Sequence, residues 1–204
     1  MTSTAPRIVA VSGSLSVPSR TTTLAHAVAE QFAEPLGASV EIVELGNLLG
    51  QLGGTHPGEL GPDAQAALAA VEAADVLIVG SPAYRATYTG IFKHFFDFVG
   101  QYALVDKPIV LTATGGSDRH ALLVEHQMRP LFGFFQALTL PLGIFATEKD
   151  FEKTEGGYVI ASEDLQTRIA LTTSRTIGLL SSQLALAGKL FDQKPEISPY
   201  PSTF

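Results

Sequence analysis

The chain contains no cysteine and no tryptophan among its 204 residues. Without a thiol it forms no disulfide, has no thiolate nucleophile and offers no sulfur ligand to a metal. Any redox chemistry therefore has to come from a borrowed cofactor. The histidines show no spacing typical of a metal site, so we predict no metal.

Charged side chains are scarce, and the acidic ones predominate. They form 16% of the chain, and 20 Asp and Glu residues against 13 Lys and Arg residues give a net charge of −7. With no basic cluster, we expect neither nucleic acid nor anionic lipid as a partner. Hydrophobic residues form 46% of the chain, but no apolar run reaches the roughly 18 residues of a membrane span. Residues 1–7 lack a signal-peptide pattern, which predicts a cytoplasmic location.

A chain of 204 residues fits one domain with a buried hydrophobic core. We predict a single domain over residues 1–204, with its core in about residues 7–187. Three prolines, Pro195, Pro199 and Pro201, fall in residues 192–204. They favour an extended tail that is either mobile or packed across a neighbouring subunit.

Apolar strand-like runs alternate with helical patterns along the chain, which predicts five βα units. The strands are expected at residues 7–12, 39–44, 76–80, 109–114 and 140–145. The helices are expected at residues 21–34, 63–73, 89–99, 119–138 and 163–187. This is the pattern of an α/β protein with a doubly wound parallel sheet. Between these elements we expect a long loop at 46–62 and a small hairpin at 149–160.

A hydroxyl-rich segment follows the first predicted strand and runs directly into the first predicted helix. It contains Ser14, Ser19, Arg20 and Thr21. Backbone N–H groups at a helix N-terminus bind phosphate. The pattern G-x-x-x-x-G-K-[ST] is absent, which argues against a nucleoside triphosphate with magnesium, and G-x-G-x-x-G is absent too. Hydroxyls with one arginine favour a single phosphate monoester such as that of FMN, and the alternative is an ordinary Ser/Thr helix cap.

Two more loops are expected at the same edge, since parallel strands end together. After the third strand come Pro82, Ala83, Tyr84 and Arg85, where proline turns the chain beside an aromatic ring that a flat heteroaromatic ligand would contact. The alternative is a turn with tyrosines packed on the surface. After the fourth strand, residues 114–117 place Thr114, Gly115, Gly116 and Ser117 in a loop. Paired glycines permit positive φ and close approach of a bulky ligand.

Pro130 interrupts the fourth predicted helix. It supplies no N–H and clashes with the carbonyl four residues earlier, which belongs to His126. We expect a kink or a π-turn around His126, placed at a subunit interface or near the ligand pocket, and the alternative is an ordinary proline kink. Lys93 and Asp97 are one helical turn apart and should pair. The helix that carries them is too apolar for a solvated face, which favours burial against another subunit.

With these residues in place, the chain resembles the NAD(P)H-dependent FMN reductase family of flavodoxin-like fold. It is most similar to the reductases of two-component alkanesulfonate and methanesulfonate monooxygenase systems. The resemblance covers roughly residues 7–187 and rests on Gly13-Ser14 with Ser19-Arg20-Thr21, on 81–93 and on 113–117. It implies a five-stranded parallel sheet of order 2-1-3-4-5 with helices on both faces.

The resemblance also implies roles for these segments. Ser14, Ser19, Arg20 and Thr21 would hold the FMN phosphate. Pro82, Ala83, Tyr84 and Arg85 would line the ribityl chain and ring, and residues 114–117 would contact the isoalloxazine edge. Family members often carry an arginine where this chain has Ser16, so Arg20 is the alternative source of positive charge. In sulfonate-system relatives the position of His126 marks a π-helix linked to flavin release and tetramer assembly, and the helix of Lys93 and Asp97 lies at a homodimer or homotetramer contact.

The implied reaction is hydride transfer from NADPH or NADH to FMN, with no catalytic protein side chain and with reduced FMN passed to a flavin-dependent monooxygenase. Arg85 is a candidate for the phosphates of the nicotinamide dinucleotide. Three alternatives stay open. The first keeps FMN bound and reduces a quinone or azo compound, the second is a flavodoxin-like electron carrier, and the third is a phosphate-binding module without flavin.

Overall fold

Parallel pairing of six strands forms the central sheet of the computed structural model, which describes residues 5–190, with side chains up to residue 185. Its path is β2-β1-β3-β4-β5, and β6 pairs with β4 beyond β5. The strands are β1 Arg7–Ser12, β2 Ser39–Glu44, β3 Val76–Pro82, β4 Pro108–Gly115, β5 Leu138–Thr139 and β6 Ile144–Thr147. This order is that of flavodoxin, so the predicted fold class is confirmed. The predicted tail at 192–204 lies outside the described residues.

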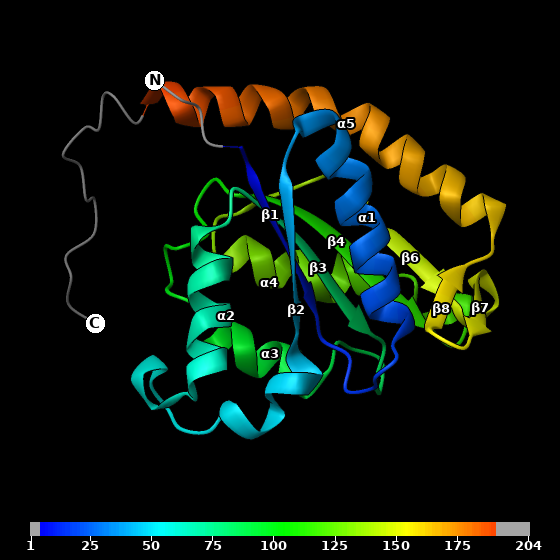
Figure 1. Cartoon of the computed structure of the whole chain (residues 1–204), viewed down its shortest axis with the longest axis horizontal. Helices are drawn as coiled ribbons and strands as arrows, with labels where there is room; N and C mark the ends of the chain where they lie inside the picture. Colours follow the sequence, from blue (N-terminus) through cyan, green and yellow to red (C-terminus); the bar gives the residue numbers. More distant parts are fainter. Residues whose placement is uncertain (1–4, 191–204) are drawn as a thin grey trace.

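Helices cover both faces of the sheet (Figure 1). The side chains of α1 (Arg20–Leu36) and α5 (Glu163–Leu190) pack in one core cluster, and those of α2 (Pro62–Ala73), α3 (Gly90–Asp97) and α4 (Arg129–Phe134) pack in the other. A separate antiparallel hairpin of β7 (Phe151–Thr154) and β8 (Gly157–Ile160) follows β6, as the sequence predicts. Figure 1 shows this hairpin beside α1.

The prediction of one fifth strand at 140–145 is wrong, because the structure has two short strands, β5 and β6, in this part of the chain. β5 ends at Thr139 and β6 begins at Ile144. Pro141 lies between them and has no N–H to donate to a sheet ladder, which explains the interruption. The loop predicted at 46–62 is also more ordered than expected, because it contains the 3₁₀ helices η1 (Leu45–Gln51) and η2 (Pro57–Glu59).

The continuous helix predicted at 119–138 is wrong. The segment consists of the 3₁₀ helix η3 (Asp118–His120), the π-helix η4 (Val124–Met128) and α4. In η4 the Arg129 N–H donates to the Val124 carbonyl, five residues back. Pro130 has no N–H for the His126 carbonyl, so widening the turn relieves the clash with that carbonyl. A π-turn around His126 is therefore what the structure contains.

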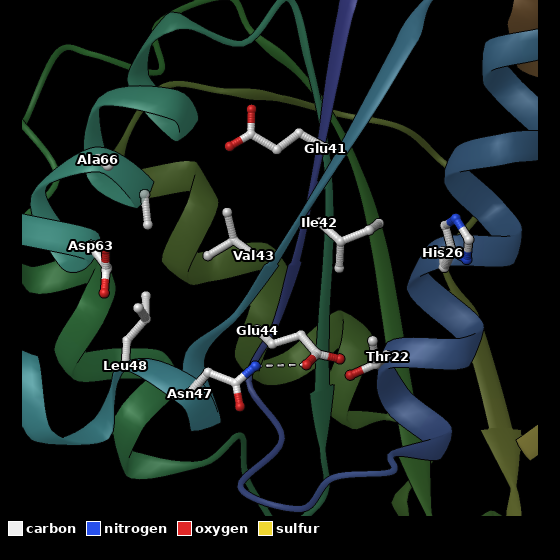
Figure 2. Close-up of a pocket in the computed structure, with 11 residues that line it drawn as sticks. Thr22, His26, Glu41, Ile42, Val43, Glu44, Asn47, Leu48, Asp63 and Ala66 are labelled. Carbon is white, nitrogen blue, oxygen red and sulfur yellow. Dashed lines mark hydrogen bonds between the residues drawn. The ribbon is translucent and has the colours of Figure 1, made fainter. Parts of the chain in front are cut away.

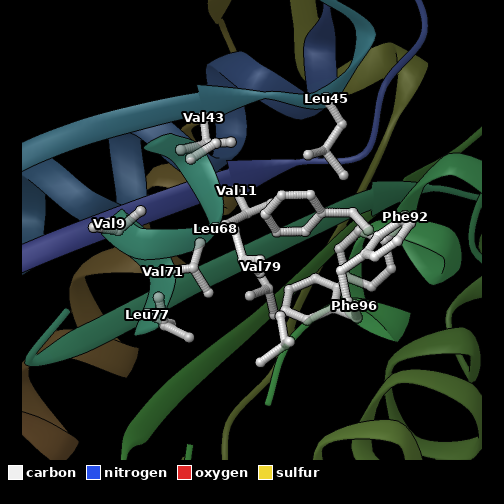
Figure 3. Close-up of a cluster of buried hydrophobic side chains, with 14 of the residues drawn as sticks. Val9, Val11, Val43, Leu45, Leu68, Val71, Leu77, Val79, Phe92 and Phe96 are labelled. Carbon is white, nitrogen blue, oxygen red and sulfur yellow. The ribbon is translucent and has the colours of Figure 1, made fainter. Parts of the chain in front are cut away.

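The core on the α2–α3–α4 side is built around phenylalanines. Phe92, Phe96 and Phe132 are each at most 1% exposed, and the Phe96 ring lies 4.9 Å from the rings of both Phe92 and Phe132. Figure 3 shows Phe92 and Phe96 packed against side chains of the central strands. The Phe96 ring meets Phe132 edge to face and Phe92 at a tilt, and this packing holds α3 and α4 on the sheet beside the carboxyl ends of β3 and β4.

Lys107 lies at the end of the sheet opposite the carboxyl ends of β3 and β4, directly before β4. Its Nζ donates to the carbonyls of Val71 and Glu72 at 3.3 and 2.7 Å, at the end of α2. Burial lowers the pKa of Lys107 to about 8. Because it binds terminal carbonyls of a helix far from the strand-end loops, we assign this perturbed lysine a structural role. Among the described residues, no helix has the length and hydropathy to cross a membrane.

The ring cluster predicts a large effect of Phe96→Ala on stability. Removing a buried phenylalanine leaves a cavity, and we expect the free energy of unfolding to fall by about 3–5 kcal/mol. Urea denaturation followed by circular dichroism measures it. Leu49→Ala, at a side chain 63% exposed on η1, is the control and should change stability by less than about 1 kcal/mol. Equal losses in both variants would contradict this account of the core.

Candidate functional site

The three loops predicted to share an edge do meet, because β1, β3 and β4 are neighbours in the sheet. Their carboxyl ends surround a cavity of about 260 Å³. It is lined by Ser14, Ser16, Pro18, Ser19, Arg20, Thr21, Pro82, Ala83, Tyr84, Thr114, Gly115, Gly116, Glu148 and Tyr158. Of the predicted binding residues, Arg85 and Ser117 are not part of this lining. Their assignment to a ligand stays a prediction, as does that of the residues that do line the cavity.

Hydrogen bonds of hydroxyl groups connect the segments that line the cavity. Thr21 Oγ1 and Thr114 Oγ1 lie 2.6 Å apart, which joins the start of α1 to the end of β4. The Ser14 hydroxyl accepts the Ser16 N–H at 3.1 Å. Ser19 accepts the Thr22 N–H at 3.2 Å and caps α1. The capping interpretation of Ser19 is therefore correct, and the same residue also lines the cavity.

Hydrogen bonds to backbone carbonyls fix the loops relative to one another. Thr89 Oγ1 donates to the Gly13 carbonyl at 2.7 Å and links the second loop to the first. The Ala83 N–H donates to the Thr114 carbonyl at 2.7 Å and links the second loop to the third. Since each loop is bonded to a neighbour, the lining residues keep one arrangement rather than three independent ones.

Arg85 projects from a tight turn rather than from the cavity wall. Tyr84 and Thr87 exchange backbone hydrogen bonds of 2.8 and 3.2 Å. Between them Arg85 and Ala86 have φ values of 50° and 70°, the conformation of a type I′ turn, which usually holds Asn or Gly. Two non-glycine residues in this conformation store strain, and strained backbone is commonest at functional sites. Tyr84 is 47% exposed at the mouth of the cavity.

The glycines of the third loop do not use the positive φ that the sequence analysis allowed for them. Neither Gly115 nor Gly116 is among the described glycines with positive φ. At Gly115 a Cβ would lie 2.8 Å from Cζ of Phe145, so this glycine makes room for a core ring. At Gly116 a Cβ would meet no atom within 4 Å. Gly116 therefore leaves open space at the cavity wall, which is the feature that a ligand needs.

Glu148 and Tyr158 line the cavity and were missed by the sequence prediction. Both reach Arg20: Glu148 Oε1 lies 3.4 Å from Arg20 Nη1, and the Tyr158 ring centroid lies 4.7 Å from the Arg20 guanidinium carbon. The signal for Glu148 was its place after a strand, but the predicted strand ended at 145 and β6 extends to Thr147. Tyr158 comes from the hairpin, whose contact with α1 only the tertiary fold reveals.

A capping box fixes the short helix that carries Glu148, η5 (Glu148–Asp150). Asp150 Oδ2 accepts the Thr147 N–H at 2.6 Å and the Thr147 hydroxyl at 2.9 Å. Burial raises the pKa of Asp150, but the hydrogen bonds from Thr147 and Ser162 and the charge of Arg168 together outweigh it and hold the pKa below its usual value of 3.8. Asp150 thus stays ionised near neutral pH and anchors this part of the wall.

A larger hollow, of about 600 Å³, lies along the edge strand β2 between α1 and α2. Figure 2 shows its side chains, among them Glu41, Glu44 and Asp63. Several pair within the protein: Asn47 donates to Glu44 at 2.9 Å, and Gln51 donates to Asp63 at 2.7 Å. Its carboxylates would repel a phosphate. The smaller cavity, at the strand ends and beside a helix N-terminus, is therefore the better candidate site.

A flavodoxin-like sheet with a hydroxyl-lined cavity at the N-terminus of α1 is typical of the class of protein that binds a phosphorylated ligand at the strand ends. The sequence profile of the NADPH-dependent FMN reductases matches residues 6–152. The chain belongs to this family of oxidoreductases.

Individual relatives agree with this assignment. The chain is 43% identical over 181 residues to an FMN reductase (NADPH) of Pseudomonas aeruginosa, covering 88% of this chain and 95% of the relative. It is 45% identical over 179 residues to the NADH-dependent FMN reductase SfnF of Pseudomonas fluorescens, covering 87% and 94%. A solved oxidoreductase from Corynebacterium diphtheriae superposes with a TM-score of 0.73 at 30% identity, covering 90% of this chain and 99% of that one.

The capping box predicts a pH-dependent effect of Asp150→Ala. At pH 7 the buried Thr147 N–H loses its acceptor, and we expect the free energy of unfolding to fall by about 1–3 kcal/mol. The folded pKa of Asp150 is lowered, so its stabilisation is present above the unfolded pKa and is lost as pH falls through the folded pKa. The difference between wild type and variant should therefore shrink below about pH 4.

Urea denaturation at pH 7 and pH 3 measures this difference. Glu152→Ala, at an exposed carboxylate on β7, is the matched control and should change stability by less than about 1 kcal/mol at both pH values. A loss in Asp150→Ala that is the same at both pH values would refute the proposed role of its charge.

Proposed function

We propose that this protein is an NAD(P)H-dependent FMN reductase that binds FMN in the strand-end cavity and releases reduced FMN to a flavin-dependent monooxygenase. The observation that carries the proposal is the meeting of three strand-end loops at a hydroxyl-lined cavity in a chain of the FMN reductase family. The relatives named above include one NADPH-linked and one NADH-dependent reductase, so the proposal covers both nicotinamide dinucleotides.

The residues of the cavity fit a phosphate monoester. Helix α1 has 17 residues and no acidic side chain in its first turn, so its N-terminus carries an uncompensated partial positive charge. Ser14, Ser19 and Thr21 supply hydroxyls at that end. Arg20 Nε is buried with no hydrogen-bond partner among the described residues. A buried donor without an acceptor is unfavourable, and an anion would satisfy it.

The other half of the cavity fits a flat ring. Pro82, Ala83 and Tyr84 line one wall, and Gly115 and Gly116 line another. The open space beside Gly116 allows a ring edge to approach the backbone, and backbone N–H groups there would face its polar atoms. The residues present therefore suit a flavin mononucleotide from phosphate to ring.

FMN, when bound, supplies the chemistry by accepting a hydride from the nicotinamide. The residues of this chain have to bind and orient the two reactants. Ser14, Ser19, Arg20 and Thr21 would hold the phosphate end, and the second and third loops would fix the plane of the ring. In this proposal no side chain of the cavity is required to move a proton, and the absence of a catalytic side chain stays a prediction. The exposed Arg85 stays a candidate contact for the nicotinamide dinucleotide.

The proposal extends to the assembly of the protein into an oligomer. Leu122 and Phe134, which flank the π-helix, are 61% and 62% exposed. Lys93 and Asp97 form the predicted ion pair on α3, and with Phe134 they line an apolar groove of about 490 Å³ between α3 and α4. Exposed apolar surface of this kind supports a homodimer or homotetramer. The roles of His126 and Pro130 in that assembly or in flavin transfer, and the cytoplasmic location, stay predictions.

Anaerobic stopped-flow mixing with excess free FMN and either NADPH or NADH tests the central proposal. We expect repeated turnover of free FMN, seen as bleaching of its visible absorption well beyond one equivalent of enzyme. Bleaching limited to one equivalent would instead favour a reductase that keeps FMN bound and passes electrons to a quinone or azo compound. The absence of bleaching with both dinucleotides would refute the nicotinamide-dependent reaction.

The open space at Gly116 predicts a selective defect in Gly116→Val. A Cβ at this position would meet no protein atom within 4 Å, so we expect the free energy of unfolding to change by less than about 1 kcal/mol, whereas FMN affinity should fall about tenfold or more. Fluorescence quenching of FMN measures binding. Gly115→Ala is the contrast, because its Cβ would clash with Phe145 and should lower stability. Unchanged FMN affinity in Gly116→Val would place the ring elsewhere.

A further inference from the structure

Arg20, the cation of the candidate phosphate site, is already engaged by two side chains from distant parts of the chain. Glu148 Oε1 lies 3.4 Å from its Nη1. The Tyr158 ring lies against its guanidinium, with 4.7 Å between ring centroid and Cζ. These contacts bring η5 and β8 to the N-terminus of α1, where the Thr23 hydroxyl also donates to the Tyr158 carbonyl at 3.4 Å; Figure 1 shows the hairpin beside α1.

The two contacts have different physical characters. The ring face of Tyr158 attracts the guanidinium by a cation–π interaction and leaves its N–H groups free for an anion in the ring plane. Glu148 instead takes up one of those N–H groups with a negative charge. The ion pair is loose, since the Arg20 and Glu148 side chains are 35% and 63% exposed, and a surface pair of this kind is readily exchanged for another anion.

Charge in the cavity is balanced by this pair alone. Among the residues that line the cavity, Arg20 is the cation and Glu148 the carboxylate, while the others are uncharged side chains or glycines. A phosphate monoester entering the cavity brings about two negative charges near neutral pH. It would therefore meet the attraction of Arg20 and the repulsion of Glu148 in the same space.

Glu148 is held in this place by its backbone. It is the first residue of η5, whose capping box joins Thr147 to Asp150. Thr147 and Asp150 are both buried, at 4% and 6% exposure. The carboxylate thus projects into the cavity from a fixed turn at the end of β6, rather than from a segment free to move away.

We propose that Glu148 sets the affinity for FMN by competing with its phosphate for Arg20, and that Tyr158 is a positioning residue that keeps the Arg20 guanidinium in the cavity. The proposal rests on the FMN binding proposed above. The site would then bind phosphate weakly, because the FMN phosphate has to displace the Glu148 carboxylate from Arg20. The carboxylate would return to Arg20 when the flavin leaves. Such a device suits an enzyme whose reduced product goes to a second protein.

Paired binding measurements with FMN and riboflavin test the role of Glu148, since riboflavin has the same ring but no phosphate. We expect Glu148→Gln to lower the Kd for FMN about tenfold while leaving the Kd for riboflavin unchanged. Raising the salt concentration should reduce the gain, because screening weakens both attraction and repulsion. Fluorescence quenching of each flavin, titrated with wild type and variant, measures these constants.

Glu152→Gln is the matched control. It removes one negative charge from the same hairpin region, but Glu152 is exposed on β7 and does not line the cavity. We expect no more than a twofold change in either Kd. An equal gain in Glu152→Gln would show that net charge alone is responsible, and an unchanged FMN to riboflavin ratio in Glu148→Gln would also overturn the competition.

Tyr158 is tested by a pair of variants. Tyr158→Leu removes the ring face and should weaken FMN binding several-fold with little effect on riboflavin, whereas Tyr158→Phe keeps the ring and should bind both flavins as wild type does. A general structural role would weaken both flavins in Tyr158→Leu. Equal binding of riboflavin and FMN by both wild type and Glu148→Gln would refute phosphate recognition by Arg20, and wild type that binds neither flavin would refute the proposed function itself.

Discussion

Parallel pairing of β1, β3 and β4 in one register is the constraint on which the site depends. Ser12 lies opposite Gly80, and Pro82 lies opposite Thr114. The three strands therefore end within a few residues of one another, at the same edge of the sheet. Gly80 is closely packed, because a Cβ there would lie 2.7 Å from the Thr112 hydroxyl. Hydrogen bonds such as the one from Thr89 Oγ1 to the Gly13 carbonyl then hold together loops that are far apart in sequence, and these loops form the wall of the cavity.

The electrostatics of the cavity follow from what surrounds that wall. The N-terminus of α1 and Arg20 favour an anion, and Glu148 opposes them from the end of β6. On the proposal above, this opposition would let the site recognise a phosphate without holding it tightly. Such a balance would suit the proposed release of reduced FMN, because the flavin would then have to arrive and depart in every turnover.

Much of the fold follows from local sequence. Apolar runs with intervening helical patterns predict the strands and their order of appearance, and Pro130 predicts the π-turn around His126. The failures have local causes too. Pro141 splits the last strand into β5 and β6, and the widened turn of η4 breaks a helix that hydrophobic periodicity shows as continuous. Periodicity detects an apolar face but not a change in the hydrogen-bonding pattern beneath it.

The sequence by itself determined the class of protein, the strand-end loops and most of the side chains that line the cavity, because those residues directly follow strands in the chain. Only the tertiary structure decided that Gly116 faces open space, that Gly115 makes room for Phe145, and that Arg20 lies between Glu148 and Tyr158. The two contacts of Arg20 join residues more than a hundred positions apart. They depend on how η5 and the following hairpin lie against the start of α1, which no local pattern of residues encodes.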